Sequence, residues 1–206
     1  MMFLRYIQKD GTNMDKKQDS KKLLAESIME LGLSKSIDDI SVQEIVNNCG
    51  LSRQTFYNHF PDKYALVEWI YKSNVLDILK IFQNGGSMFD TILAKLNFIY
   101  RNPNFYKKVY RKELFLASFT DITKQLYLNM VSHKTNNQLT DQLEFMIDFL
   151  VEACVKRTSA WVLGGMKESP EHIATSFLSC IPNGLTSYLL TDDDYARIKN
   201  STSSTT

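Results

Sequence analysis

Apolar residues recur along the chain at spacings of three and four, and only eight glycines and four prolines interrupt the pattern. This period places apolar side chains on one face of an α-helix, whereas a strand would alternate apolar and polar residues. The pattern therefore predicts an all-α protein of about nine helices. In the first helix Leu24, Ile28 and Leu31 form the apolar stripe, and Gly32 is predicted to end the helix in the left-handed conformation.

Two signals predict the start of a second helix at Val42. Ser41 and Glu44 have the S-x-x-E spacing of a capping box, in which each side chain accepts a hydrogen bond from the other residue's backbone amide. Ile40 and Ile45 occupy the positions of the apolar pair that often flanks such a start. Because the two signals are independent, their agreement favours a well-defined helix start.

A third helix is predicted only a few residues later. Gly50 suits the end of the second helix, and Ser52 is a suitable N-cap for the third. Two short helices joined by a glycine-containing turn are typical of a helix-turn-helix, whose second helix enters the major groove of DNA. A fourth, longer helix is predicted from its N-cap, Asp62, to the break at residues 84–86.

The remainder of the chain continues the helical pattern. Further helices are predicted at residues 88–101, 104–118, 121–133, 139–166 and 170–190. The last of them begins with a cap, a proline and an acidic residue, Ser169 to Glu171. We therefore expect an N-terminal three-helix domain at residues 14–63 and a larger helical domain at residues 64–192, with disordered segments at residues 1–13 and 200–206.

Composition restricts the possible partners. The formal net charge is +1 at pH 7, so the chain as a whole has no excess charge that would attract nucleic acid or a membrane surface.

The three cysteines of the chain, Cys49, Cys154 and Cys180, lack the spacing of a zinc site or a disulfide framework. No cofactor or metal is expected. The first residues have too short an apolar run for a secretion signal, and a cytoplasmic location is favoured.

The predicted third helix has two unlike faces. At about 100° per residue, Phe56 and Phe60 lie together on the inner face. The other positions carry groups that suit DNA: arginine can bind guanine with two hydrogen bonds, Gln and Asn can bind adenine in the same way, and lysine and tyrosine suit phosphates. The candidate DNA-binding residues are Arg53, Gln54, Thr55, Tyr57, Asn58, His59 and Lys63.

The local charge does not decide between DNA binding and an ordinary solvated face. Residues 14–66 carry seven Lys and Arg residues against eight Asp and Glu residues. The acidic residues lie mainly before Gly50, so the segment that would meet DNA is not itself acidic. These residues alone leave both interpretations open.

A family resemblance favours DNA binding. The stretch ISVQEIVNNCGLSRQTFYNHFPDKYALVEWI, residues 40–70, resembles the DNA-binding region of the TetR family of bacterial transcriptional regulators, and the resemblance covers residues from about 19 to 70. SRQTFYNHF together with WVLGGMKESPEHIA (residues 161–174) also resembles the subgroup that includes the activator of dihydroxyacetone kinase operons. The resemblance implies that the seven candidate residues occupy positions that commonly touch DNA.

The same resemblance implies a homodimer, because the last two helices of each subunit usually form the interface in this family. Two recognition helices about 34 Å apart match successive major grooves, which predicts a palindromic operator. Burial within one subunit is the alternative for each apolar residue of the predicted interface. These residues are Phe145, Phe149, Trp161, Phe177, Ile181 and Leu185.

The larger domain would then sense an effector, either a small molecule or a protein. Aromatic residues are abundant there, although aromatics at helical spacing more often form plain core than a ligand pocket. The candidates are Phe98, Tyr100, Phe105, Tyr106, Tyr110, Phe115, Phe119 and Tyr127.

No enzyme motif accompanies these features. The sequence contains no P-loop, G-x-S-x-G, H-E-x-x-H or dinucleotide-binding motif, and His133 and His172 are isolated. We therefore predict a regulator without catalytic residues. The alternative from another class is a helical dimer that acts as a protein-interaction module and does not bind DNA.

Overall fold

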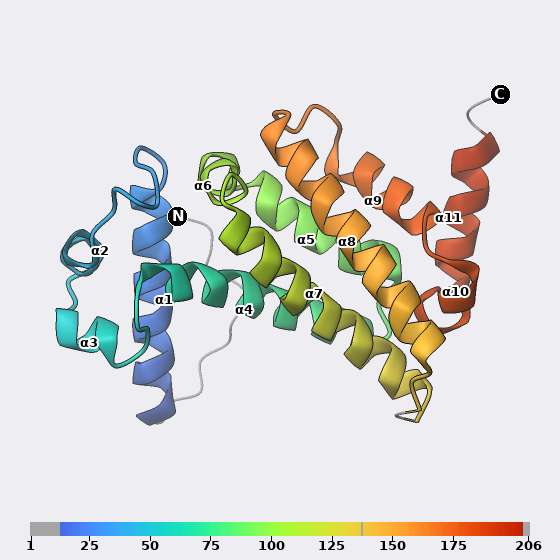
Figure 1. Ribbon diagram of the computed structural model, residues 1–206, viewed down its shortest axis with the longest axis horizontal. Coiled ribbons are helices and arrows are strands. Elements are labelled where there is room, and N and C mark those ends of the chain that lie inside the picture. Colours follow the sequence, from blue (N-terminus) through green and yellow to red (C-terminus); the bar gives the residue numbers. More distant parts are fainter. Residues whose placement is uncertain (1–12, 137, 204–206) are drawn as a thin grey trace. The chain divides into compact units, whose positions relative to one another are not determined.

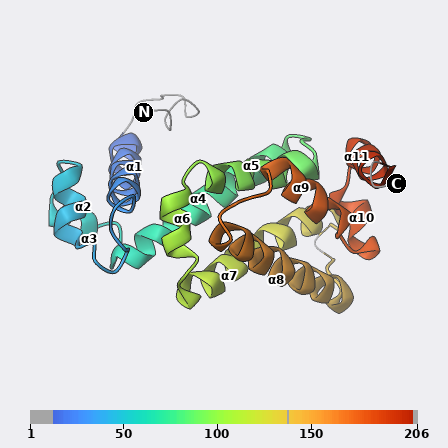
Figure 2. The same cartoon turned by 90° about the horizontal axis from the view of Figure 1, so that it is seen from above.

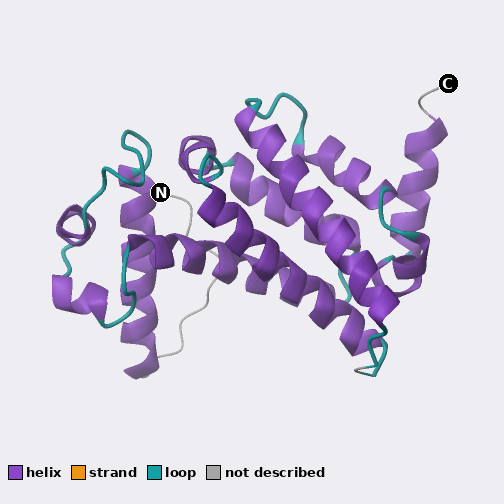
Figure 3. Cartoon of the chain, viewed as in Figure 1, coloured by secondary structure: helices purple, strands orange, loops and turns teal. Residues whose placement is uncertain are grey.

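The computed structural model describes residues 13–136 and 138–203. Within these ranges the chain forms eleven α-helices and no strand, which confirms the predicted all-α class (Figure 1 and Figure 3). In chain order they are α1 (Asn13–Leu31), α2 (Val42–Asn48), α3 (Arg53–Tyr57), α4 (Lys63–Gln83), α5 (Met88–Tyr100), α6 (Pro103–Val109), α7 (Glu113–Lys134), α8 (Asp141–Leu163), α9 (Pro170–Ser179), α10 (Asn183–Leu189) and α11 (Asp192–Ser203).

α2, α3 and α4 begin where the capping signals predict, but the end of α1 differs from the prediction. The described glycines with a positive φ are Gly50, Gly85 and Gly165, so the left-handed conformation predicted for Gly32 is wrong. The Gly32 amide instead donates to the carbonyl of Ile28 at 2.9 Å, and short hydrogen-bonded turns follow it. The helix therefore unwinds gradually and needs no left-handed residue.

The helices predicted at 104–118 and 121–133 are divided at a different place. α6 ends at Val109, and α7 runs unbroken from Glu113 to Lys134. Thr120, at the predicted break, lies inside α7, where its hydroxyl donates to the carbonyl of Leu116 at 2.9 Å. Neither glycine nor proline lies between α6 and α7, so the sequence has no strong signal at the true break.

The single helix predicted at 170–190 is two helices, α9 and α10. Pro182 stands between them, and a proline inside a helix would remove one backbone hydrogen bond and clash with the preceding turn. α11 then adds a helix that the apolar pattern did not reveal, and it includes residues 200–203 of the expected tail. Residues 1–12 and 204–206 of the segments predicted to be disordered lie outside the described residues.

The described residues divide into two compact units, one up to Val67 and the other from Glu68 onward. The first unit contains α1, α2, α3 and the start of α4, and its core residues are almost fully buried. They include Leu24, Ile28, Ile37, Ile40, Ile45, Phe56 and Leu66. The functions predicted for the two domains stay predictions.

Within the described ranges, no helix combines the length and the apolar character needed to cross a membrane.

The second unit is built from paired helices. α7 runs alongside α8, and α5 packs against α9 (Figure 1 and Figure 2). Most of the aromatic residues considered for an effector pocket form the core of this unit instead. The fully buried ones are Phe105, Tyr106, Tyr110, Phe115 and Phe119, which agrees with the plain-core alternative.

The residues predicted for the dimer interface differ in exposure. Trp161, Ile181 and Leu185 are buried within the single chain, so the prediction that they form the interface is wrong. Phe145 and Phe149, one turn apart on α8, are 72% and 66% exposed. Large apolar side chains that are this exposed on one helix face are typical of a contact with another molecule.

A buried carboxylate attaches α11 to the start of α5. Asp194 is fully buried, and its two oxygens accept hydrogen bonds from the backbone amides of Met88 (3.0 Å) and Phe89 (2.9 Å) and from Thr191. The Arg197 guanidinium also lies 4.1 Å from the centre of the Phe89 ring. One side chain thus satisfies amides at the starts of two helices that are far apart in sequence.

Candidate nucleic-acid interface

A small polar network fixes α2 on α1. The buried Ser27 hydroxyl donates to the carbonyl of Ile45 at 2.7 Å. The side-chain Nδ2 of Asn48 donates to Ser27 Oγ at 3.2 Å and to Glu30 Oε2 at 3.1 Å. Because these bonds join the middle and the C-terminal end of α2 to one face of α1, they restrict the orientation of α2.

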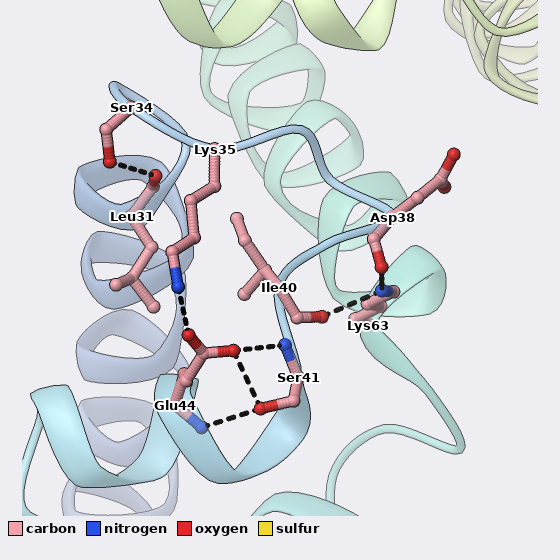
Figure 4. Close-up of polar contacts among 8 residues, drawn as sticks. All are labelled: Leu31, Ser34, Lys35, Asp38, Ile40, Ser41, Glu44 and Lys63. Atoms are coloured by element: carbon pink, nitrogen blue, oxygen red, sulfur yellow. Dashed lines mark hydrogen bonds and ion pairs between the residues drawn. The ribbon is translucent and has the colours of Figure 1, made fainter.

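The predicted capping box at the start of α2 is confirmed (Figure 4). The Glu44 amide donates to Ser41 Oγ at 3.2 Å, and the Ser41 amide donates to Glu44 Oε2 at 2.9 Å. Lys35 forms an ion pair with the same carboxylate. The hydrogen bond from Lys35, followed by those from Ser41, lowers the pKa of Glu44 from 4.5 to about 2.

The turn between α2 and α3 is also defined by backbone bonds. Gly50 has a φ of +69°, which a residue with a side chain rarely adopts. The Leu51 amide donates to the carbonyl of Val46 at 2.9 Å, as in a Schellman motif. Ser52 then caps α3, since its Oγ accepts from the Thr55 amide at 3.0 Å. The predicted functions of Gly50 and Ser52 are confirmed.

The inner face of α3 anchors it to the core. Phe56 is completely buried and Phe60 is 4% exposed, and their ring centres lie 5.9 Å apart. On the other side, Arg53, Gln54, Tyr57 and Asn58 are exposed, while Thr55 and His59 are half-buried. The inner and outer faces therefore lie where the helical period predicts.

The exposed side chains of α3 are paired with one another. Gln54 Nε2 donates to Asn58 Oδ1 at 2.9 Å. The Arg53 guanidinium lies 3.4 Å from the Tyr57 hydroxyl and 5.8 Å from the centre of its ring. These contacts between residues four positions apart restrict the rotamers of four candidate residues before any ligand binds.

Lys63 has a structural contact that the sequence did not reveal. Its ammonium donates to the carbonyl oxygens of Asp38 and Ile40, the latter at 2.7 Å (Figure 4). Asp62 Oδ1 accepts from the amides of Tyr64 and Ala65 at 2.8 Å, which confirms it as the N-cap of α4. Lys63 therefore ties the start of α4 to the turn that precedes α2. No signal could have predicted this contact, because the acceptors are backbone atoms more than 20 residues away in sequence.

Both parts of the chain match described families. Residues 26–70 match the bacterial regulatory proteins of the tetR family, and residues 86–183 match a transcriptional regulator C-terminal region. Together these matches cover more than half of the chain. The chain belongs to the TetR family of bacterial transcriptional regulators. The helix-turn-helix built by α2 and α3 is thus part of a TetR-family regulator.

Curated relatives agree with this assignment. The HTH-type dhaKLM operon transcriptional activator DhaS of Lactococcus lactis subsp. lactis (strain IL1403) is 28% identical over 98 residues, which are 48% of this chain and 52% of that protein. The uncharacterized HTH-type transcriptional regulator YuxN of Bacillus subtilis (strain 168) is 26% identical over 148 residues, which are 70% of this chain and 49% of that protein. The chain thus spans about half the length of the curated relatives it matches.

Solved structures of TetR-family proteins have the same fold. The dihydroxyacetone kinase operon activator DhaS matches with a TM-score of 0.63 at 19% identity, over 82% of this chain and 98% of that chain. A TetR transcriptional regulator from Streptococcus agalactiae 2603V matches with a TM-score of 0.57 at 16% identity, over 82% and 97% of the two chains. These matches confirm the predicted all-α fold.

The lowered pKa of Glu44 predicts a pH dependence of stability. A carboxylate whose pKa is lowered in the folded protein stabilises the fold fully at pH values above its ordinary pKa. This stabilisation is lost as the pH falls from about 4.5 to about 2. Glu44→Gln should therefore be less stable than the wild type at pH 7 and lose less stability across that window. Urea unfolding midpoints over a pH series measure this difference.

Glu26→Gln, on α1, is the matched control for this experiment. The Glu26 carboxylate has no hydrogen bond or ion pair with any residue in the described part of the chain. Its variant should keep the wild-type dependence on pH. If Glu44→Gln also kept that dependence, the capping box and its Lys35 pair would not hold the carboxylate in its charged form.

Proposed function

We propose that this TetR-family regulator binds a palindromic operator as a homodimer through α3, and that a signal received by the second unit controls its affinity for DNA. The observation that carries the proposal is the outer face of α3. Its polar side chains are paired and exposed on a helix held by two buried aromatic rings. A rigid surface of hydrogen-bonding groups suits the reading of base edges, because little conformational freedom is lost on binding.

The Gln54–Asn58 pair has a pattern that suits adenine. Since Gln54 Nε2 donates to Asn58 Oδ1, the Gln54 carbonyl oxygen and the Asn58 amino group remain available. Adenine presents an N6 donor and an N7 acceptor in the major groove. One acceptor and one donor held side by side complement that edge. Arg53, one position earlier and on the flank of this face, is also exposed and suits the two acceptors of guanine.

The remaining candidates suit the DNA backbone. Lys63 donates to two carbonyl oxygens, but an ammonium has three hydrogens and keeps its full charge, so one donor remains for a phosphate. The Tyr57 hydroxyl is exposed and can donate to a second phosphate. Thr55 and His59 are half-buried, so they would contact DNA only at the edge of the binding surface. These residues would position α3, and the base contacts would supply specificity.

We infer that the homodimer forms around the exposed face of α8. Phe145 and Phe149 lie on this face, and Ala153 and Ala160 continue it at helical spacing beside the exposed Glu152 and Lys156. Small residues beside two large rings would allow two α8 helices to approach closely. A second copy of the chain would bury both rings and place two α3 helices about a dyad, which is the geometry that a palindromic operator needs.

The first prediction of this proposal concerns Arg53. The operator is first selected with the wild-type protein from a library of random duplexes. Arg53→Ala should weaken binding to that operator by about 1–3 kcal/mol, because it removes a bidentate base contact, while binding to random duplex should weaken much less. Fluorescence anisotropy titrations at fixed salt measure both affinities.

Arg101→Ala is the matched control for this experiment, since Arg101 is an exposed arginine at the end of α5 in the second unit. It should bind both duplexes as the wild type does. A folded wild-type dimer that failed to enrich any sequence from the library would contradict operator recognition. That result would favour the alternative, a helical dimer that acts as a protein-interaction module.

The second prediction concerns Phe149. Phe149→Glu should convert the dimer to a monomer, because an interface that buries this ring would have to bury an unpaired carboxylate instead. Sedimentation equilibrium measures the mass in solution. Leu114→Glu, at a leucine on α7 that is 58% exposed, is the control and should stay dimeric. A dimer that tolerated Phe149→Glu would place the interface elsewhere.

A further inference from the structure

The positive charge of the chain is concentrated in one stretch. Residues 91–112 contain six Lys and Arg residues and no Asp or Glu. The formal net charge of the whole chain is +1, so the other residues together carry a net charge of −5. Four of the six cations, Lys107, Lys108, Arg111 and Lys112, belong to α6 and to the turn that follows it. A local excess of this size creates a positive potential that the net charge of the chain conceals.

The opposite side of α6 is fixed in the core of the second unit. α6 packs against α5 and α8 (Figure 2). Four of its residues, or of the turn after it, are at most 2% exposed, and these are Phe105, Tyr106, Val109 and Tyr110. The cations are therefore carried by a helix whose orientation is defined by buried side chains, and they lie on a fixed surface.

Lys107 and Arg111 lie on one exposed face of this helix. Tyr110, its C-cap, has helical dihedral angles of φ −68° and ψ −9°, so the helical spacing continues to Arg111. Residues four positions apart are about 6 Å apart along a helix and point to the same side. Asn104, also exposed, lies on this side as well. We call Asn104, Lys107 and Arg111 the basic face of α6.

The two cations of the basic face have no carboxylate partner. Both are exposed, and within residues 13–136 and 138–203 neither forms an ion pair. Glu113, the nearest acidic residue along the chain, begins α7 and does not pair with either of them. Lys107 and Arg111 thus keep their charge and their hydrogen-bond donors for another molecule.

The composition of the basic face favours phosphate groups over a protein surface as its partner. Among the large apolar side chains that are exposed in the described ranges, none belongs to α6. Protein interfaces depend on apolar and aromatic anchors that become fully buried. Contacts with phosphates need only cations and other hydrogen-bond donors, and the arginine fork matches phosphate oxygens well.

A continuous helix keeps the second unit near any DNA that the first unit binds. α4 begins in the first unit and continues into the second. Its 21 residues span about 32 Å. When α3 holds an operator, duplex DNA beside that operator is therefore present at a high effective concentration for the second unit.

We propose that the basic face of α6 binds the phosphate backbone of the duplex that flanks the operator, outside the base pairs that α3 reads. The inference rests on the proposed function, because α3 must first hold the operator. Lys107 and Arg111 would each neutralise one phosphate, and a homodimer has two such faces. These contacts would add affinity and salt dependence without sequence specificity.

Two duplexes test this contact with the full-length protein. One is the selected operator trimmed to its selected base pairs, and the other adds about 20 base pairs, two helical turns, of arbitrary sequence on each side. The wild type should bind the longer duplex more tightly. Its plot of log affinity against log salt should also be steeper, by about 0.9 for each additional phosphate and up to about 3.6 for four phosphates. Fluorescence anisotropy over a salt series measures both quantities.

Lys107→Gln/Arg111→Gln should bind the trimmed operator as the wild type does and should lose the gain from the flanks. Both positions are exposed, so the variant should fold and remain dimeric, which sedimentation equilibrium checks. Lys72→Gln/Lys80→Gln is the matched control, because it removes two exposed lysine charges from α4. It should keep the wild-type difference between the two duplexes.

Three results would overturn the inference: equal binding of both duplexes by the wild type, a wild-type difference retained by Lys107→Gln/Arg111→Gln, or equal losses by that variant on both duplexes. The first would favour an acidic protein surface as the partner of this face. A wild type that selected no operator would contradict the proposed function instead. Binding of an arbitrary duplex would then test the phosphate contact alone, and an unchanged salt dependence in the double variant would overturn it.

Discussion

The burial of Phe56 and Phe60 is the interaction on which the rest of the helix-turn-helix depends. α3 has five residues, and a helix of that length is unstable in water because its first turn costs more conformational entropy than its hydrogen bonds return. Its stability must come from packing. The two rings supply it on the inner face, and they leave Arg53, Gln54 and Tyr57 exposed on the outer face.

The caps and the polar contacts of the first unit refine this arrangement. The Ser41–Glu44 box and the Ser52 cap define where α2 and α3 begin, and Gly50 defines the angle between them. Lys63, at the start of α4, binds the segment between α1 and α2. Lys35, within that segment, pairs with Glu44 on α2. Several of these contacts lie at the surface, where a single contact contributes little to the stability of the fold. Together they limit the orientations that α3 can adopt.

The sequence predicted the features that have local signals. The starts of α2, α3 and α4 each depend on a polar side chain within three residues of the amide it caps, and such signals are visible in sequence. The break after α6 has no such signal, and the apolar pattern does not predict the break at Pro182 because it continues across that residue. The contacts of Lys63 and Asp194 join segments far apart in sequence, and only the folded chain brings them together.

The candidate DNA-binding residues show the same division. Helical period was sufficient to separate Phe56 and Phe60 from the exposed positions, but it could not show that Gln54 pairs with Asn58 or that Lys63 binds backbone carbonyls. Period could also not separate Phe145 and Phe149, which are exposed, from Ile181 and Leu185, which are buried. Exposure depends on which helices pack together, and that is a property of the tertiary structure.

Operator recognition depends on the reading of individual base pairs by the outer face of α3. The most direct test measures the affinity of the wild type and of Gln54→Ala for the selected operator and for variants with one A·T pair changed in each half-site. One such change should weaken operator binding by the wild type by about 1–3 kcal/mol but have little further effect on binding by Gln54→Ala. Equal losses for both proteins at every position would contradict base reading by this residue.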